Sequence, residues 1–275
     1  MAIKQIKSTS NARRQMTVQD FNISSKTSEK SLTTGKRRIS GRNVNGRITV
    51  ENRGGGAKRK YRFIDFNRTS KLDVKAKVKT LEYDPNRSSN IALIEYNDKD
   101  ISYILAPSDL KVGDEVICSQ NAKATAGNRM MMKNMPASSQ IFNIELQLNR
   151  GGQMVRSAGN FATLMGIDGD EATLRLPSGE IRKVKSDLFA TIGVGSNTDH
   201  SNVVIGKAGR VRNMGKRPNV RGKAKNPCDH PHGGGEGNTS IGLKYPKTAW
   251  GMPALGHKTR NKKKRSNSVI VKRRK

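Results

Sequence analysis

Two short β-rich runs and the polar turn between them decide the fold of this chain: Ile91-Ala92-Leu93-Ile94-Glu95-Tyr96, Asn97-Asp98-Lys99-Asp100 and Ile101-Ser102-Tyr103-Ile104-Leu105. β-branched and aromatic residues favour strands, and a tetrapeptide rich in Asn and Asp favours a turn. The pattern predicts an antiparallel hairpin. Further short strands are expected around it, where Val74, Ala76 and Val78 alternate with lysines and where Glu115–Cys118 follows a Val-Gly-Asp turn. Several short strands at this spacing predict a small barrel.

A second set of β-rich runs lies further along the chain. It comprises residues 141–148, 153–155, 161–165, 172–176, 180–184 and 188–192. The turn Pro177-Ser178-Gly179 predicts that 172–176 and 180–184 form a hairpin. Helical periodicity is scarce, so we predict a mainly β fold with two consecutive small antiparallel barrels. Residues 119–140 form either a linker or the lip of the second barrel, and their methionines (Met130–Met132 and Met135) indicate adaptable packing more than metal ligation.

Positive charge is concentrated at the two ends of the chain. Residues 1–62 hold 16 Lys and Arg against 3 Asp and Glu, residues 203–275 hold 20 against 2, and residues 63–202 hold 17 of each. The ends are also poor in large apolar residues, so by themselves they cannot offset the entropy cost of ordering. We expect a basic N-terminal extension (1–62), a first barrel (63–125), a second barrel (126–202) and a basic C-terminal extension (203–275), with the extensions extended or disordered until a polyanion neutralises them.

Nucleic acid is the polyanion that fits this composition best. Two distant cysteines make no disulfide framework, and no apolar run is long enough for a transmembrane helix or a secretory signal. Residues 1–19 are basic, as in an organellar transit peptide, but lack its amphipathic pattern. A membrane surface would require an amphipathic helix or a lipidation signal. Aromatic residues make up only 4% of the chain, so binding is expected to run mainly through phosphates.

The N-terminal extension contains a possible short strand, Gly46–Val50, followed by the glycine triplet Gly54–Gly56 among basic residues. Glycines without a Cβ let the backbone approach a surface closely, and flanking cations can then reach phosphates. The alternative is a flexible hinge before the first barrel. In the C-terminal extension, Gly209 to Lys216 does not have the spacing of a nucleotide-binding P-loop, and the basic run Lys262–Arg265 fits a phosphate-binding segment better than a nuclear address.

The loop Asn226–Gly237 combines a thiol, two imidazoles and two carboxylates with glycines and prolines. Cys228, His230 and His232 are zinc-type ligands, but their spacing and the lack of a second ligand pair disfavour a zinc site. Asp229 could orient His230 as a general base, but no nucleophile is identifiable and a flexible segment preorganises catalysis poorly. The favoured interpretation is a docking loop whose imidazoles hydrogen-bond ribose or phosphate.

Many motifs occur in an order that resembles the L2 family of large-subunit ribosomal proteins, of bacterial or organellar type. The resemblance runs from near residue 3 to the C-terminus. The motifs that carry it are Gly46-Arg47-Ile48-Thr49-Val50, Arg53-Gly54-Gly55-Gly56, Tyr83-Asp84-Pro85-Asn86-Arg87-Ser88, Tyr103-Ile104-Leu105-Ala106-Pro107, Gly151-Gly152-Gln153, Arg156-Ser157-Ala158-Gly159, Leu176-Pro177-Ser178-Gly179-Glu180, Gly206-Lys207-Ala208-Gly209-Arg210 and Asp229-His230-Pro231-His232-Gly233-Gly234-Gly235-Glu236-Gly237.

The resemblance implies that the first barrel is an OB-fold and the second an SH3-like barrel. It also implies a primary rRNA-binding protein that supports subunit assembly and association, lies near the peptidyl transferase centre at His230, and is not an enzyme. The RNA-binding residues expected from charge and motif together are Arg53, Gly54, Gly55, Gly56, Lys58, Arg59, Lys60, Arg62, Arg87, Arg156, Lys207, Arg210, Arg212, Lys216, Arg217, Arg221, His230, His232, Gly233, Gly234, Lys258, Arg260, Lys262 and Lys263.

The expected partners are large-subunit rRNA, other ribosomal proteins and, across a bridge, the small subunit, with no membrane. No cofactor is expected beyond magnesium carried by the rRNA. The chain departs from the family pattern at Ala57, Asn213-Met214 and Cys228, which weakens carry-over of roles at those positions. Two other hypotheses remain: a nucleic-acid compaction protein that binds through its tails alone, and an enzyme centred on His230. The expected location is a bacterial cytoplasmic ribosome, with an organellar ribosome as the alternative.

Overall fold

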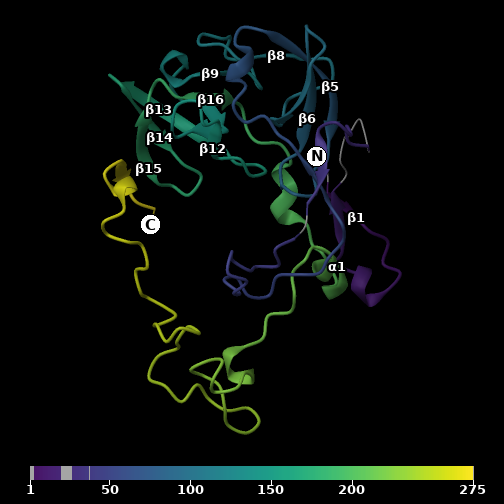
Figure 1. The fold of residues 1–275 in the computed structure, drawn as a ribbon, viewed down its shortest axis with the longest axis vertical. Coiled ribbons are helices and arrows are strands. Elements are labelled where there is room, and N and C mark those ends of the chain that lie inside the picture. Colours follow the sequence, from purple (N-terminus) through teal and green to yellow (C-terminus); the bar gives the residue numbers. More distant parts are fainter. Residues whose placement is uncertain (1–2, 20–26, 37, 275) are drawn as a thin grey trace. The chain divides into compact units, whose positions relative to one another are not determined.

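The computed structural model describes residues 3–19, 27–36 and 38–274, and it is mainly β with one short α-helix among them, α1 (Ala208–Asn213). The chain, drawn in Figure 1, divides into two units by its internal contacts. The barrel unit comprises Met1–Arg37, Lys58–Ala208 and Ser268–Lys275, and the arm unit comprises Arg38–Ala57 and Gly209–Asn267. The arm unit therefore takes residues from both basic extensions, a grouping that cuts across the boundaries expected from charge. No helix in the described part of the chain has the length and apolarity to span a membrane.

The first barrel is built on a four-stranded antiparallel sheet in the order β7-β6-β5-β8. Its strands are β5 (Lys75–Glu82), β6 (Ile91–Tyr96), β7 (Ile101–Leu105) and β8 (Glu115–Ile117). The central strand β6 is buried on both faces: Ala92 and Ile94 pack into one apolar cluster, and Ile91 and Leu93 pack into another with Tyr103. The predicted hairpin is confirmed, with β6 and β7 paired from Ile91↔Leu105 to Glu95↔Ile101. This barrel is the OB-fold.

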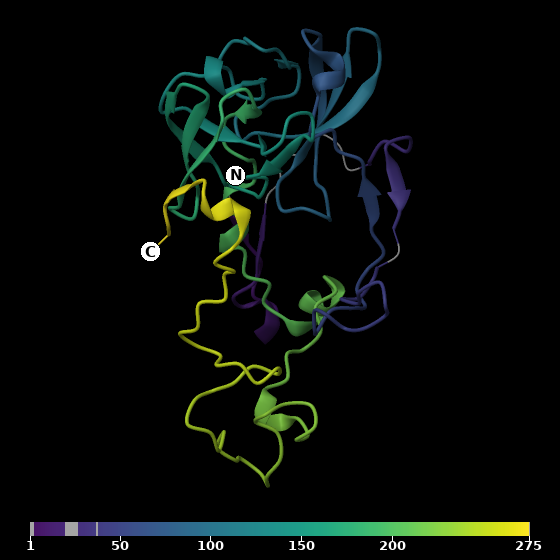
Figure 2. The ribbon, with the colours of Figure 1, turned by 60° about the vertical axis from the view of Figure 1, so that its left-hand side comes forward.

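The second barrel is a seven-stranded sheet in the order β17-β15-β14-β13-β10-β16-β9. Its strands are β9 (Arg129–Met131), β10 (Gln140–Phe142), β13 (Ala162–Asp168), β14 (Glu171–Arg175), β15 (Ile181–Lys185), β16 (Phe189–Ile192) and β17 (Ile270–Lys272). Met130, Met132 and Met135 are buried in its core, which confirms that these methionines serve packing. The hairpin around Pro177-Ser178-Gly179 is also confirmed. This barrel is the SH3-like one, and Figure 2 shows its strands from a second side.

The remaining strands form two-stranded ribbons. They are β1 (Ile3–Gln5) with β2 (Thr17–Gln19), β3 (Thr33–Gly35) with β4 (Lys60–Arg62), and β11 (Ile144–Glu145) with β12 (Gly152–Met154).

Three features of the strands differ from the sequence expectation. The run 141–148 is not one strand, because Asn143 takes a left-handed conformation (φ 51°) and separates β10 from β11. Gly46–Val50 makes no strand: only Ile48 pairs, in an isolated bridge to Arg42, and the amides of Thr49 and Val50 both bond to one carbonyl, that of Gly41. The C-terminal extension ends in β17, which pairs with β15 at the edge of the second barrel.

A buried ion pair connects the two barrels within the barrel unit. Arg129 and Glu145 have no exposed side-chain surface, and Arg129 Nη2 lies 3.3 Å from Glu145 Oε1. Arg129 also donates to the carbonyls of Asn67, which precedes β5, and of Asn143, between β10 and β11. Glu145 accepts from the amides of Gly151 and Phe189. Burial lowers the pKa of Arg129, while the carboxylate of Glu145 acts in the opposite direction.

A second buried carboxylate lies in the first barrel. Glu82 accepts a hydrogen bond from the Tyr103 hydroxyl, 2.8 Å away. Burial raises the pKa of Glu82, and burial, aided by the adjoining Glu82 carboxylate, raises the pKa of Tyr103 to about 12. Tyr103 therefore stays protonated and remains a hydrogen-bond donor at physiological pH.

Breaking the Arg129–Glu145 pair is expected to destabilise the barrel unit strongly. Either Arg129→Met or Glu145→Gln leaves polar groups buried without partners, which costs about 3–5 kcal/mol of unfolding free energy. The double variant is expected to cost less than the sum of the two. Urea unfolding of the full chain measures these changes. The control is Lys133→Met, which breaks the exposed Lys133–Asp187 pair and is expected to cost at most about 1 kcal/mol. The ion-pair assignment would be contradicted if each single variant lost no more unfolding free energy than Lys133→Met and if the two losses simply added in the double variant.

Candidate nucleic-acid interface

The arm unit is held together by a backbone crossing between its two segments. The amide of Gly54 donates to the carbonyl of Gly215 (3.0 Å), and the amide of Ala57 donates to the carbonyl of Asn213 (3.0 Å). Arg53 and Lys216 form an antiparallel bridge beside these bonds. We call the crossing of residues 52–57 with residues 213–217 the clasp. It shows that the two basic extensions, which are distant in sequence, fold against each other.

Glycines make this close approach possible. Gly56 (φ 91°) and Gly215 (φ 88°) both take left-handed conformations. A Cβ on Gly56 would lie 2.7 Å from the Asn213 carbonyl oxygen and 2.7 Å from the Gly215 amide nitrogen. A Cβ on Gly55, in contrast, would meet nothing closer than the Arg212 guanidinium, at 3.9 Å. The triplet thus meets protein backbone at Gly56 and leaves Gly55 open to a ligand.

Arginine and lysine side chains also support the clasp. Arg38 donates from Nη1 to the Gly55 carbonyl (2.6 Å) and from Nη2 to the Ala57 carbonyl (2.9 Å). Lys225 pairs with Glu51 at 3.0 Å. Arg38 and Lys225 were absent from the expected binding residues, and no sequence signal marked them, because their partners lie in distant or backbone positions.

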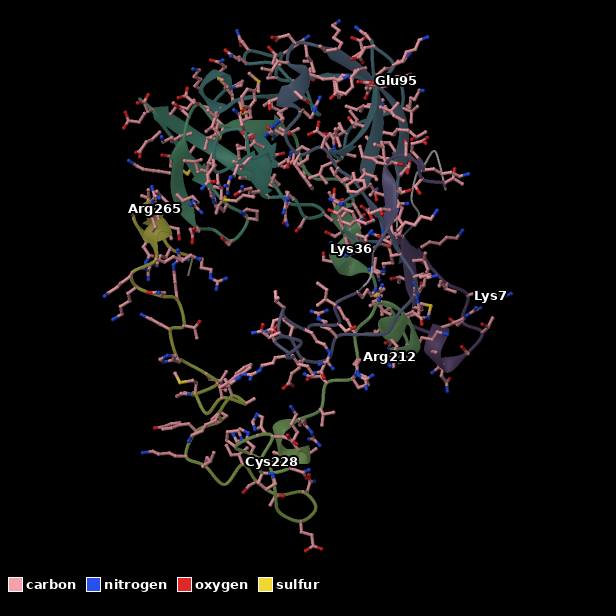
Figure 3. The ribbon with its side chains drawn as sticks, in the orientation of Figure 1. Lys7, Lys36, Glu95, Arg212, Cys228 and Arg265 are labelled. Carbon is pink, nitrogen blue, oxygen red and sulfur yellow. The ribbon has the colours of Figure 1, made fainter. Side chains whose placement is uncertain are left out.

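The arm unit has a large excess of positive charge. Its residues include 19 Lys and Arg against 3 Asp and Glu. Figure 3 shows the side chains of this unit around the labelled Arg212 and Cys228. Most of the expected binding residues belong to it: Arg53, Gly54, Gly55, Gly56, Arg210, Arg212, Lys216, Arg217, Arg221, His230, His232, Gly233, Gly234, Lys258, Arg260, Lys262 and Lys263. This density of cations on a largely exposed segment is suited to contact with several phosphates.

The loop around His230 is folded onto itself. His230 Nδ1 accepts from the amide of His232 (3.0 Å), and His232 Nε2 accepts from the amide of Lys247 (2.8 Å). The rings of the two histidines lie 4.7 Å apart. Gly222 lies directly against the His230 ring, since a Cβ there would be 2.5 Å from Nδ1. Both imidazoles therefore bond to protein backbone and shape the loop.

The second glycine triplet closes the same loop. A Cβ on Gly233 would lie 2.2 Å from the Asn226 carbonyl oxygen, and one on Gly235 would lie 2.4 Å from the Thr239 methyl group. The amide of Gly233 donates to the carbonyl of His230 (2.8 Å). Cys228 is exposed in this loop. Within residues 3–19, 27–36 and 38–274, no three His, Cys, Asp or Glu side chains are grouped as metal ligands.

The other expected binding residues belong to the barrel unit: Lys58, Arg59, Lys60, Arg62, Arg87, Arg156 and Lys207. Arg62 is only 8% exposed and lies 3.7 Å from the buried carboxylate of Asp84, so little of it is available to a phosphate. Arg87 pairs with Asp84 at 2.6 Å, in the turn that the Asp84-Pro85-Asn86-Arg87 motif forms. RNA contact at these residues stays a prediction.

The Phe66 ring is close to the guanidinium groups of two of these arginines. The Arg156 guanidinium lies 4.7 Å from the Phe66 ring centroid, and that of Arg87 lies 5.6 Å from it. Such contacts hold a guanidinium in place while leaving its N–H groups available. Phe66 carried no functional signal in the sequence, since it is one of six phenylalanines in an ordinary β-rich context.

A methyl group at Gly56 is expected to open the clasp. Gly56→Ala places a Cβ within 2.7 Å of the opposite backbone at a positive φ, so the Gly54 and Ala57 hydrogen bonds cannot both persist. Limited trypsinolysis should then cut faster after Arg53 and after Lys216, the two residues that form the bridge of the clasp. Gly209→Ala is the matched control, because it adds the same methyl group in the same unit with no atom within 4 Å. Equal cleavage rates in the two variants would contradict the clasp.

Two family models match the chain. Ribosomal Proteins L2, RNA binding N-terminal domain, matches residues 29–118, which include the OB-fold strands. Ribosomal Proteins L2, C-terminal domain, matches residues 125–251, which include most of the SH3-like barrel and the His230 loop. The two matches agree with the resemblance found in the sequence motifs and with the order of the two barrels. The chain therefore belongs to the ribosomal protein L2 family, whose members are structural, RNA-binding proteins of the large ribosomal subunit.

Proposed function

We propose that this chain is a primary rRNA-binding protein of its subunit and that the arm unit makes most of the contact with rRNA. The observation that carries this proposal is the arm unit itself, in which 19 cations and 3 carboxylates share a backbone folded by the clasp and the His230 loop. Charge attracts any polyanion, whereas fixed loops can select an RNA by shape. A compaction protein that binds through tails alone needs no such loops.

The barrels supply fewer available cations. Lys75, Lys133 and Lys183 pair with carboxylates of neighbouring strands or turns at 2.7–3.1 Å. Each pair cancels a charge that would otherwise attract phosphate. The barrels are therefore suited to orient the arm unit on the rRNA and to contact other ribosomal proteins.

The finer roles follow from the family resemblance. We infer that the protein supports assembly of the large subunit and its association with the small subunit, and that the His230 loop lies near the peptidyl transferase centre. The role of His230 is architectural. Its Nδ1 already accepts a backbone hydrogen bond and its ring packs on Gly222, so the imidazole acts as a support for the loop and not as a general base.

The same proposal includes the host ribosome and the cofactors. The host ribosome is a bacterial one, with an organellar ribosome as the alternative. The protein needs no cofactor of its own, and magnesium bound to rRNA screens the phosphates that the arm unit approaches. Zinc at Cys228, His230 and His232 is disfavoured, because His230 Nδ1 and His232 Nε2 each accept from a backbone amide, which places the proton of each neutral imidazole on its other ring nitrogen.

The salt dependence of rRNA binding tests whether the arm unit contacts more phosphates than the barrels do. Neutralising Lys262, Lys263 and Lys264 to Gln is expected to reduce the slope of log affinity against log salt by about 2–3, because each lost phosphate contact removes about 0.7–0.9. The matched control neutralises Lys75, Lys133 and Lys183, which removes the same charge from the barrels and should change the slope by less than about 1. Filter binding of the full chain to large-subunit rRNA measures both.

Two results would contradict the proposal. The first is an equal slope change in the two triple variants, which would mean that charge acts regardless of its position. The second is equal affinity of the full chain for large-subunit rRNA and for an unrelated RNA of the same length at physiological salt, which would favour the compaction protein.

A further inference from the structure

An exposed tryptophan stands at the turn of a hairpin in the arm unit. The hairpin spans residues 246–254 and is closed by hydrogen bonds from the Thr248 amide to the Met252 carbonyl (2.7 Å) and from the Ala254 amide to the Pro246 carbonyl (2.8 Å). Trp250 lies at its turn and is 79% exposed. The chain has one tryptophan. A large aromatic side chain that is exposed to solvent at a turn indicates a ligand-binding surface.

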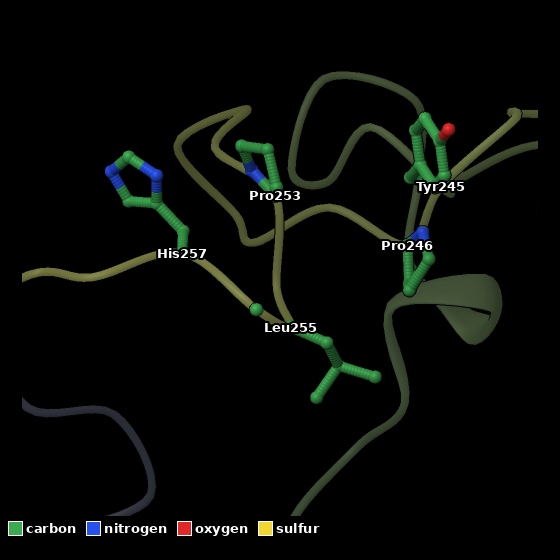
Figure 4. Close-up of a pocket in the computed structure, with 6 residues that line it drawn as sticks. Tyr245, Pro246, Pro253, Leu255 and His257 are labelled. Atoms are coloured by element: carbon green, nitrogen blue, oxygen red, sulfur yellow. The ribbon is translucent and has the colours of Figure 1, made fainter.

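A pocket lies at the foot of the same hairpin. It has a volume of about 530 Å³ and is lined by Tyr245, Pro246, Pro253, Leu255, Gly256 and His257 (Figure 4). Tyr245 is 61% exposed and Leu255 is 79% exposed, so the pocket opens to solvent. Its lining is mainly apolar or aromatic, which suits a flat apolar group rather than a phosphate.

The positive charge around the hairpin indicates which class of ligand it binds. Residues 237–267 include no Asp or Glu; Lys247 lies in the hairpin, and Lys244 and Lys258 lie on either side of it in sequence. The Lys244 ammonium lies 5.6 Å from the Tyr245 ring centroid. Apolar protein surfaces offer no negative charge to such a segment. An unpaired nucleotide offers both a flat base and a phosphate, which is the combination that aromatic and basic residues bind in single-stranded RNA.

We infer that this hairpin binds unpaired bases of rRNA, with Trp250 stacking on one base and the pocket beside Tyr245 and Leu255 receiving another. The inference rests on the proposed function and deepens it, because it adds base stacking at one defined element to a contact otherwise made through phosphates.

Fluorescence of the single tryptophan tests the inference on the full chain. Titration with a large-subunit rRNA fragment that has unpaired loops should quench Trp250 and protect it from acrylamide, and a perfectly paired duplex of equal length should do neither. Trp250→Ala should weaken binding to the looped RNA about 5- to 150-fold, since stacking contributes about 1–3 kcal/mol per base. Trp250→Phe should retain most of the affinity.

The salt dependence separates stacking from charge. Trp250→Ala should leave the slope of log affinity against log salt unchanged, because stacking releases no counterions, whereas Lys247→Gln should reduce the slope by about 0.7–0.9. Binding of the looped RNA with normal salt dependence, but with Trp250 still accessible and Trp250→Ala as tight as the parent chain, would overturn the inference and leave the proposed function intact.

Shielding of Trp250 in assembled subunits but not in the rRNA complex would also overturn the inference, because it would assign the hairpin to a protein partner. Absence of salt-dependent rRNA binding altogether would reject the proposed function and the inference with it.

Discussion

The organisation of the basic extensions depends on one constraint: two strongly cationic segments are held together by hydrogen bonds of the backbone. The Gly54–Gly215 and Ala57–Asn213 bonds make this contact, and Arg38 braces the N-terminal segment by donating to the carbonyls of Gly55 and Ala57. Each contributes about 0.5–1.5 kcal/mol net. Exposed charges more than about 8 Å apart are largely screened at physiological salt, so a few such bonds can offset the repulsion. Backbone bonds also leave the side-chain cations available to phosphate.

In the barrel unit, a basic and an acidic residue pair in the interior. There, Arg129 and Glu145 are fully buried and hydrogen-bonded to backbone from both barrels. A buried ion pair is costly to desolvate, and it persists where its geometry fixes the positions of several loops at once. Arginine thus orders the interior of one unit and contributes to the positive charge of the other. In the barrel unit the buried arginine is paired with a carboxylate, whereas the arm unit has 19 Lys and Arg against only 3 Asp and Glu.

Much of the fold follows from local patterns in the sequence. The hairpins at Ile91–Leu105 and Glu171–Lys185 have β-rich runs and clear turn residues, so periodicity and turn chemistry predict them. Asn143 breaks an apolar run by its backbone conformation, and β17 forms because Ile270 finds a distant edge strand. The clasp is non-local in the same way. Glycine triplets indicate close approach, but only the fold shows that Gly56 meets Gly215 and that Gly55 stays open.

On the proposed function, the arm unit makes more contact with rRNA than the barrels do. Lysine modification of the full chain, free and bound to large-subunit rRNA, distinguishes the two units, with each site read by mass spectrometry. We expect Lys216, Lys223, Lys247 and Lys262 to lose reactivity on binding, while Lys75, Lys133 and Lys183 of the barrels keep theirs. Protection of the barrel lysines with unchanged reactivity in the arm unit would contradict it.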